Sequence, residues 1–78
     1  MTKPTLLIVD DEKPTREGLR AALEDRFDVY LAEDAKAAME LLERESFDVM
    51  LTDFQMPNED GMKLIGRAKS LAKPPVCI

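Results

Sequence analysis

A short apolar run that ends in two carboxylates constrains the fold of this chain more than any other feature. Residues 6–9 (LLIV) are followed directly by Asp10 and Asp11. Consecutive apolar residues without polar alternation are typical of a strand buried on both faces, as in parallel sheets. The run is far shorter than the ~20 residues of a membrane span. It therefore predicts a central strand of an α/β domain whose end carries negative charge.

The next segments alternate between helix and strand. Pro14 suits the first turn of a helix, and apolar residues then recur at helical spacing, which predicts a helix over about 14–26. A second strand is expected over 29–32, and Asp34 is a good N-cap for a second helix that ends near Glu45. The inward positions of the two helices are predicted to be Leu19, Ala22, Leu23 and Phe27, then Ala35, Ala38, Met39 and Leu42.

The second half of the chain repeats the alternation. Residues 47–52 predict a third strand, 54–61 a loop, and a third helix follows with Leu64, Ile65 and Ala68 facing inward. Two prolines at 74–75 break that helix, and residues 76–78 begin a fourth strand. The order βαβαβαβ predicts a doubly wound parallel sheet with right-handed crossovers.

Three carboxylates follow predicted strands directly: Asp10 and Asp11 after the first, and Asp53 after the third. In open α/β sheets, ligands bind beyond the carboxyl ends of the strands, where the strand order reverses. If the first strand lies between the second and third, these side chains converge. Each like-charged pair would repel by about 4 kcal/mol at ~4 Å and an effective dielectric of ~20. A bound cation would offset that repulsion, and oxygen ligands favour Mg²⁺, with Mn²⁺ as a substitute.

Simpler interpretations of the same carboxylates stay open at this point. The acidic residues Asp10, Asp11 and Glu12 could complement the positive end of the first helix, and Asp53 could cap a loop. The functional interpretation is that one carboxylate acts as a nucleophile and forms an aspartyl-phosphate while the others hold the metal.

Three blocks of the sequence resemble the receiver domain of bacterial response regulators. They are residues 6–12 (LLIVDDE), 48–57 (DVMLTDFQMP), and Asp60-Gly61 followed by Leu64 and Ile65. Their spacing fits as well, and together they cover nearly all of the chain. The resemblance implies a flavodoxin-like fold with the family's strand order 2-1-3-4-5. It also implies a cytoplasmic protein of two-component signalling that takes a phosphoryl group from a sensor histidine kinase, rather than an enzyme with turnover.

The resemblance assigns a role to each matching residue. Asp53 would be the phosphoacceptor, and Asp10, Asp11, Asp53 and the backbone carbonyl of Gln55 would hold Mg²⁺. No organic cofactor is implied. The sequence of the predicted third strand and of the loop after it is similar to that of receivers of transcriptional activators.

Two family residues, a hydroxyl that ends strand 4 and a lysine that ends strand 5, would lie beyond Ile78. The 78 residues are therefore expected to be a partial receiver domain, comprising strands 1–3, helices 1–3 and the start of strand 4. Such a piece is expected to come from a longer protein, or to protect strand 4 by edge pairing or element exchange in a homodimer. Alone, it is expected to show little stable phosphorylation.

Other functions fit the sequence less well. A Mg²⁺-dependent phosphatase of the haloacid-dehalogenase type needs a carboxylate two residues after its nucleophile, where this chain has Gln55 after Asp53 and Glu12 after Asp10. A flavodoxin-type flavin carrier needs a phosphate-binding loop after strand 1, where this chain is acidic. A flavodoxin-like interaction module without signalling stays open.

Composition limits partners and compartment. The net charge of −5 and the absence of a basic stripe disfavour direct binding to nucleic acid. A single cysteine allows no internal disulfide, and no signal peptide is recognisable, which favours a reducing cytoplasm without membrane attachment.

Overall fold

Four parallel strands form one sheet in the order β2-β1-β3-β4. The computed structural model describes residues 3–52, 60–71 and 73–77, and the side chains of 60–62 are not part of that description. The strands are β1 (Thr5–Val9), β2 (Asp28–Ala32), β3 (Val49–Thr52) and β4 (Val76–Cys77). This confirms the predicted doubly wound α/β class and the central position of β1.

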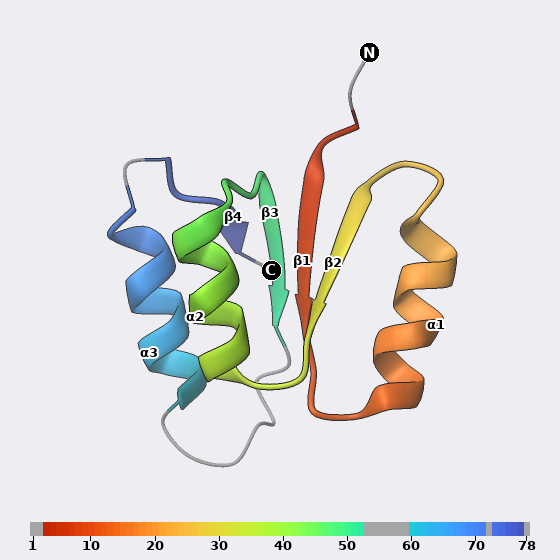
Figure 1. Ribbon diagram of the computed structural model, residues 1–78, viewed down its shortest axis with the longest axis horizontal. Helices are drawn as coiled ribbons and strands as arrows, with labels where there is room; N and C mark the ends of the chain where they lie inside the picture. The colour runs from red at the N-terminus through yellow and green to blue at the C-terminus, as the bar shows by residue number, and fades with distance from the viewer. Residues whose placement is uncertain (1–2, 53–59, 72, 78) are drawn as a thin grey trace.

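Three helices connect the strands and cover the sheet from two sides. They are α1 (Lys13–Leu23), α2 (Ala35–Arg44) and α3 (Asp60–Lys69). In Figure 1 the sheet is seen nearly edge-on, with α1 on one side and α2 and α3 together on the other. No helix in the described ranges has both the length and the apolar character to cross a membrane.

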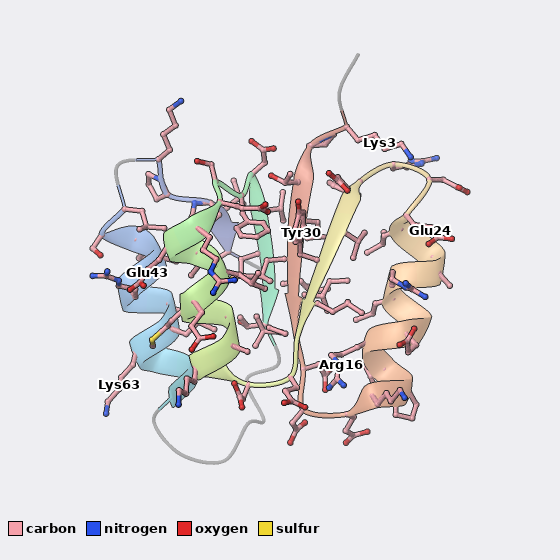
Figure 2. All side chains as sticks on the ribbon, in the orientation of Figure 1. Lys3, Arg16, Glu24, Tyr30, Glu43 and Lys63 are labelled. Atoms are coloured by element: carbon pink, nitrogen blue, oxygen red, sulfur yellow. The ribbon has the colours of Figure 1, made fainter. Side chains whose placement is uncertain are left out.

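The core is centred on β1, whose residues 6–9 are all almost completely buried, as expected for a strand covered on both faces. Alternation along a strand sends successive side chains to opposite faces. Leu7 and Val9 belong to the main apolar cluster under α2 and α3, which also contains Met50 and Leu64. The intervening Leu6 and Ile8 lie on the α1 side. Figure 2 shows side chains filling the space on both sides of the sheet.

Helix α1 covers its face of the sheet only thinly, which corrects one expectation. None of its residues is buried: Leu19 and Leu23 are half-buried, and Ala22 is exposed. The helix also ends at Leu23 rather than near residue 26, because the next residues form a turn in which the amide of Phe27 still bonds to the carbonyl of Leu23 at 2.9 Å. The predicted apolar spacing is correct, but the predicted burial is not.

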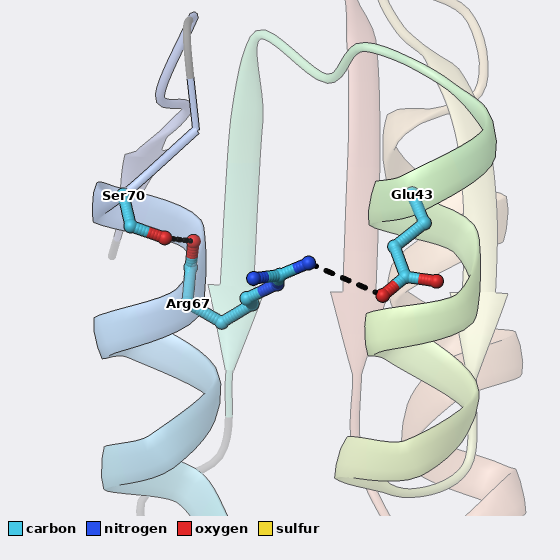
Figure 3. Close-up of polar contacts among 3 residues, drawn as sticks. All are labelled: Glu43, Arg67 and Ser70. Carbon is cyan, nitrogen blue, oxygen red and sulfur yellow. Dashed lines mark hydrogen bonds and ion pairs between the residues drawn. The ribbon is translucent and has the colours of Figure 1, made fainter.

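Helices α2 and α3 pack side by side over the main cluster. Asp34 caps α2 as predicted, since its Oδ1 accepts a hydrogen bond from the amide of Ala37 at 2.8 Å. Arg67 of α3 forms an ion pair with Glu43 of α2 at 3.3 Å, and the hydroxyl of Ser70 donates to the carbonyl of Arg67 at 2.7 Å (Figure 3). Both charged side chains of the pair are at least half exposed, so the ion pair contributes little to stability.

Two other boundaries differ from those expected. β3 begins at Val49 rather than at Phe47. Phe47 is buried just before the strand, with its ring edge-on to Tyr30 at a centroid distance of 5.2 Å. Helix α3 begins at Asp60, so Gly61 belongs to the helix and not to the preceding loop.

Hydrogen bonds between Thr5 and residues 46–48, at the amino ends of β1 and β3, fix the relative register of these strands. The Thr5 amide donates to Asp48 Oδ2 at 2.9 Å, and the Thr5 hydroxyl donates to the Ser46 carbonyl at 3.0 Å. In return, the Asp48 amide donates to the Thr5 carbonyl at 3.0 Å. A slip of one residue would break these bonds and turn every side chain to the wrong face.

Candidate functional site at the carboxyl edge of the sheet

The carboxyl ends of β1, β2 and β3 lie level with one another. Val9, the last residue of β1, is paired with Ala32 on one side and with Thr52 on the other. The amide of Asp10 extends the β1–β2 ladder by one more bond, to the carbonyl of Ala32 at 3.1 Å. Asp10 and Asp11 therefore emerge beside the end of the strand that precedes Asp53 in the sequence, as the sequence predicted.

Asp10 is held at three points and is only 7% exposed. Besides its amide bond, its Oδ1 accepts a hydrogen bond from the amide of Glu12 at 2.9 Å. Its carbonyl accepts one from Nη1 of Arg16 at 2.7 Å. The next two acidic residues, Asp11 and Glu12, are exposed. The edge thus presents one fixed, buried carboxylate and two that face solvent.

The carboxylate of Asp10 has no cationic partner in the described residues, where the ion pairs are Arg20–Glu17 and Arg67–Glu43. Buried charges are normally paired or coordinate a metal. One backbone donor leaves most of the acceptor capacity of this carboxylate unused. The donor set and its burial therefore suit a hard cation such as Mg²⁺.

A cleft of about 520 Å³ lies between α1 and the β1–β3 pair and opens at this edge. Ile8, Leu19 and Leu51 form apolar walls. Its polar residues include Asp10, Glu12, Thr15 and Thr52. The polar residues of the cleft gather at its carboxyl-edge end and the apolar ones lie deeper between α1 and the sheet.

The predicted site residues are only partly covered by the structure. It brings Asp10 and Asp11 to the edge, whereas Asp53 and Gln55 lie outside the described residues. Within the described ranges, no three Asp, Glu, His or Cys side chains are grouped so that they could hold a metal. The predicted four-member ligand set stays a prediction, because two of its members are not among those residues.

Two polar residues at this edge were not singled out from the sequence. Arg16 could have been noticed as a basic residue in the helix that directly follows an acidic pair. Thr52 is a hydroxyl residue at the end of a strand and is 8% exposed, yet its Oγ1 has no hydrogen-bond partner in the described part of the chain. Buried hydroxyls without a partner are uncommon in folded proteins.

Comparison with known proteins identifies the family of this chain. The family model of the response regulator receiver domain matches residues 6–78, which covers β1 from its second residue and the other described strands in full. The chain belongs to the response regulator receiver domain family. The resemblance noted in the sequence is thereby confirmed.

Relatives of this receiver domain occur both as short and as long proteins. An uncharacterized 14.6 kDa protein from Leptolyngbya boryana is 45% identical over 69 residues, which cover 87% of this chain and 53% of that protein. The hydrogenase transcriptional regulatory protein HoxA of Bradyrhizobium diazoefficiens is 39% identical over 72 residues, covering 92% of this chain and 15% of HoxA. The chain thus spans about half of the shorter relative and a small part of the longer one.

The receiver fold is equally clear from solved structures. The chemotaxis response regulator CheY4 of Vibrio cholerae superimposes with a TM-score of 0.86 at 25% identity, covering 96% of this chain and 66% of CheY4. The agreement extends over nearly every described element, so the receiver chain follows the flavodoxin-like path from β1 to β4.

Proposed function

We propose that this receiver domain accepts a phosphoryl group on Asp53 from a sensor histidine kinase of a bacterial two-component system. The observation that carries the proposal is the pairing of Val9 with Thr52. Neighbouring strands lie about 4.8 Å apart. Val9 directly precedes Asp10 in the sequence and Thr52 directly precedes Asp53, so the described strand ends next to the two proposed residues lie side by side.

The proposed metal ligands are Asp10, Asp11, Asp53 and the backbone carbonyl of Gln55, with Mg²⁺ as the ion and Mn²⁺ as a substitute. The buried carboxylate of Asp10, which accepts one backbone hydrogen bond among the described residues, supports this choice. The exposed Asp11 is free to approach an ion from the solvent side. When bound, the ion would neutralise the developing charge on the phosphoryl oxygens.

The proposed reaction is a transfer between two side chains. An oxygen of the Asp53 carboxylate attacks the phosphorus of a phosphohistidine on the kinase. The O–P bond forms as the N–P bond breaks, and the departing imidazole keeps the electron pair and takes up a proton. The product is an aspartyl-phosphate, so the domain acts as a phosphoacceptor signalling module rather than as an enzyme with turnover.

The proposal also covers the cellular role of the domain. The likeness to HoxA supports a role in transcription regulation, with the phosphorylated receiver controlling an output function in the cytoplasm. The net charge of −5 and the acidic edge argue against direct contact of this domain with nucleic acid.

The test is phosphorylation of the purified full-length protein with Mg²⁺ and labelled acetyl phosphate. We expect an acid-stable, hydroxylamine-sensitive label that is lost in Asp53→Asn. Asp25→Asn, an equal change of charge at an exposed residue, is the matched control and should keep the label.

Three outcomes would contradict the proposal. Labelling of Asp53→Asn equal to that of the parent would remove Asp53 from its role. A parent protein that takes no label would favour an interaction module without signalling. Continuous release of phosphate from many substrates would favour a phosphatase.

A further inference from the structure

We infer that Arg16 is a positioning residue that sets the acidic pair for metal binding. The inference rests on the proposed function, because it concerns the same Mg²⁺ site. Arg16 is half-buried on α1, and in Figure 2 it lies near the loop that joins β1 to this helix. Its Nη1 donates to the carbonyl of Asp10 at 2.7 Å.

The bond from Arg16 reaches a carbonyl that the sheet leaves without a donor. The amide of Asp10 bonds to Ala32, but no backbone amide of the described residues outside the regular strand ladders donates to the Asp10 carbonyl, and the β1 ladders end at Val9. A buried carbonyl without a donor is costly, and a charged donor makes the stronger kind of hydrogen bond. Arg16 therefore fixes the peptide group that joins the two acidic residues.

The Arg16 guanidinium fixes this peptide group without forming an ion pair with a carboxylate. Arg16 forms no ion pair with an acidic side chain of the described residues. An arginine paired with Asp10 or Asp11 would compete with a cation for the same oxygens. Here the side chain holds the backbone and leaves the carboxylate oxygens to the ion, in the manner of the outer-shell groups that orient metal ligands.

A positioning role and a purely electrostatic role of Arg16 predict opposite changes in metal affinity when the residue is removed. A positive charge near a cation site repels the cation, so removing it should tighten metal binding if charge were all that mattered. If Arg16 positions the acidic pair, its removal should weaken binding instead. The sign of the change in Mn²⁺ affinity therefore separates the two roles.

The experiment measures Mn²⁺ binding to the full-length protein by the loss of the free-ion EPR signal, in Arg16→Met, Arg16→Lys and Arg20→Met. Arg20 lies one turn further along α1 and is half exposed in an ion pair with Glu17, so Arg20→Met is a matched loss of charge. We expect Arg16→Met to bind Mn²⁺ about tenfold more weakly, at the lower end of the effects of outer-shell partners. Arg20→Met should bind as the parent does, or slightly more tightly.

Lysine can supply a single donor to a carbonyl, so Arg16→Lys should recover the affinity to within a factor of about three. Hydrogen exchange of the Glu12 amide gives a readout without metal. It should accelerate in Arg16→Met and not in Arg20→Met, because this amide donates to Asp10 Oδ1.

The outcomes separate the positioning role of Arg16 from the proposed function of the domain. Unchanged or tighter Mn²⁺ binding by Arg16→Met, with a parent that binds Mn²⁺, would overturn the role of Arg16 and leave the proposed function intact. A parent that binds no Mn²⁺ would overturn both. If Arg16→Met does not fold, Arg16→Lys decides, since a tenfold loss in that variant would contradict a role that one donor can fill.

Discussion

Replacing Thr52 by valine should stabilise the protein, although it removes a polar group next to the proposed phosphoacceptor. The Thr52 side chain is 8% exposed and its Oγ1 has no hydrogen-bond partner in the described ranges. Mutational data put the cost of burying such a hydroxyl at about 1–3 kcal/mol. Valine has nearly the same shape, is well suited to a strand and needs no partner.

The expected gain is therefore about 1–2 kcal/mol in the free energy of unfolding. For a domain of this size, each kcal/mol raises the melting temperature by about 4–8 °C. Urea and thermal denaturation of Thr52→Val, followed by circular dichroism, would measure both quantities. The slope of the urea transition should not change, because the surface exposed on unfolding is the same.

The same substitution at Thr5 should have the opposite effect and serves as the control. The Thr5 hydroxyl donates to the Ser46 carbonyl and accepts a hydrogen bond from the Asp48 amide at 3.2 Å. Thr5→Val breaks both bonds and should cost about 1 kcal/mol. If Thr52→Val lowered stability as Thr5→Val does, the Thr52 hydroxyl would have a partner in the folded protein and the reasoning would be refuted.

Three further predictions follow from the described contacts. The neighbouring Glu45 carboxylate raises the pKa of Tyr30 above its usual 10.0, chiefly because it favours the protonated hydroxyl as a hydrogen-bond donor, so absorbance titration of this single tyrosine should have its midpoint above 10.0, and Glu45→Gln should lower that midpoint. Because the raised pKa keeps the folded state protonated, the associated stability should be present below pH 10 and be lost as the pH rises through the pKa. Glu43→Gln, which removes the exposed ion pair with Arg67, should change stability by less than about 1 kcal/mol in urea denaturation; a larger loss would contradict the weak-pair argument. A polypeptide of residues 1–78 should form dimers in light scattering, because β4 pairs only with β3 among the described strands and leaves an edge open; a mass independent of concentration at the monomer value would rule out the dimer.

The order and type of the elements could be predicted because they depend on local patterns. Residues 6–9 are apolar throughout, and the structure buries all of them in β1. Asp34 was expected to cap a helix, and it does so through the amide of Ala37. The carboxyl edge could also be predicted, since Asp10 and Asp11 come directly after a strand whose neighbours the family resemblance implied.

Burial and exact boundaries could not be predicted, because they depend on residues far away in the chain. Helical spacing marked Ala22 as inward, but how deeply a helix is covered depends on what else packs there, and Ala22 is exposed. Phe47 was expected within a strand, and instead it packs against Tyr30 just before β3. Arg16 gave little signal, since an arginine on a helix is usually solvated, and only its distance to the Asp10 carbonyl reveals the contact.

The strand order has a consequence for how the domain is assembled. Leu6 pairs with Val29 in β2, but on its other side it pairs with Val49 in β3, almost twice as far along the chain. Closing the longer loop costs about 0.5 kcal/mol more in chain entropy, and β3 also leaves the ribosome later. The edge that is proposed to receive the phosphoryl group is thus built by the longer-range of the two pairings that β1 makes. A chain in which only β1 and β2 have paired would still lack the β3 side of this edge, so phosphorylation at this edge would show that β3 has joined β1.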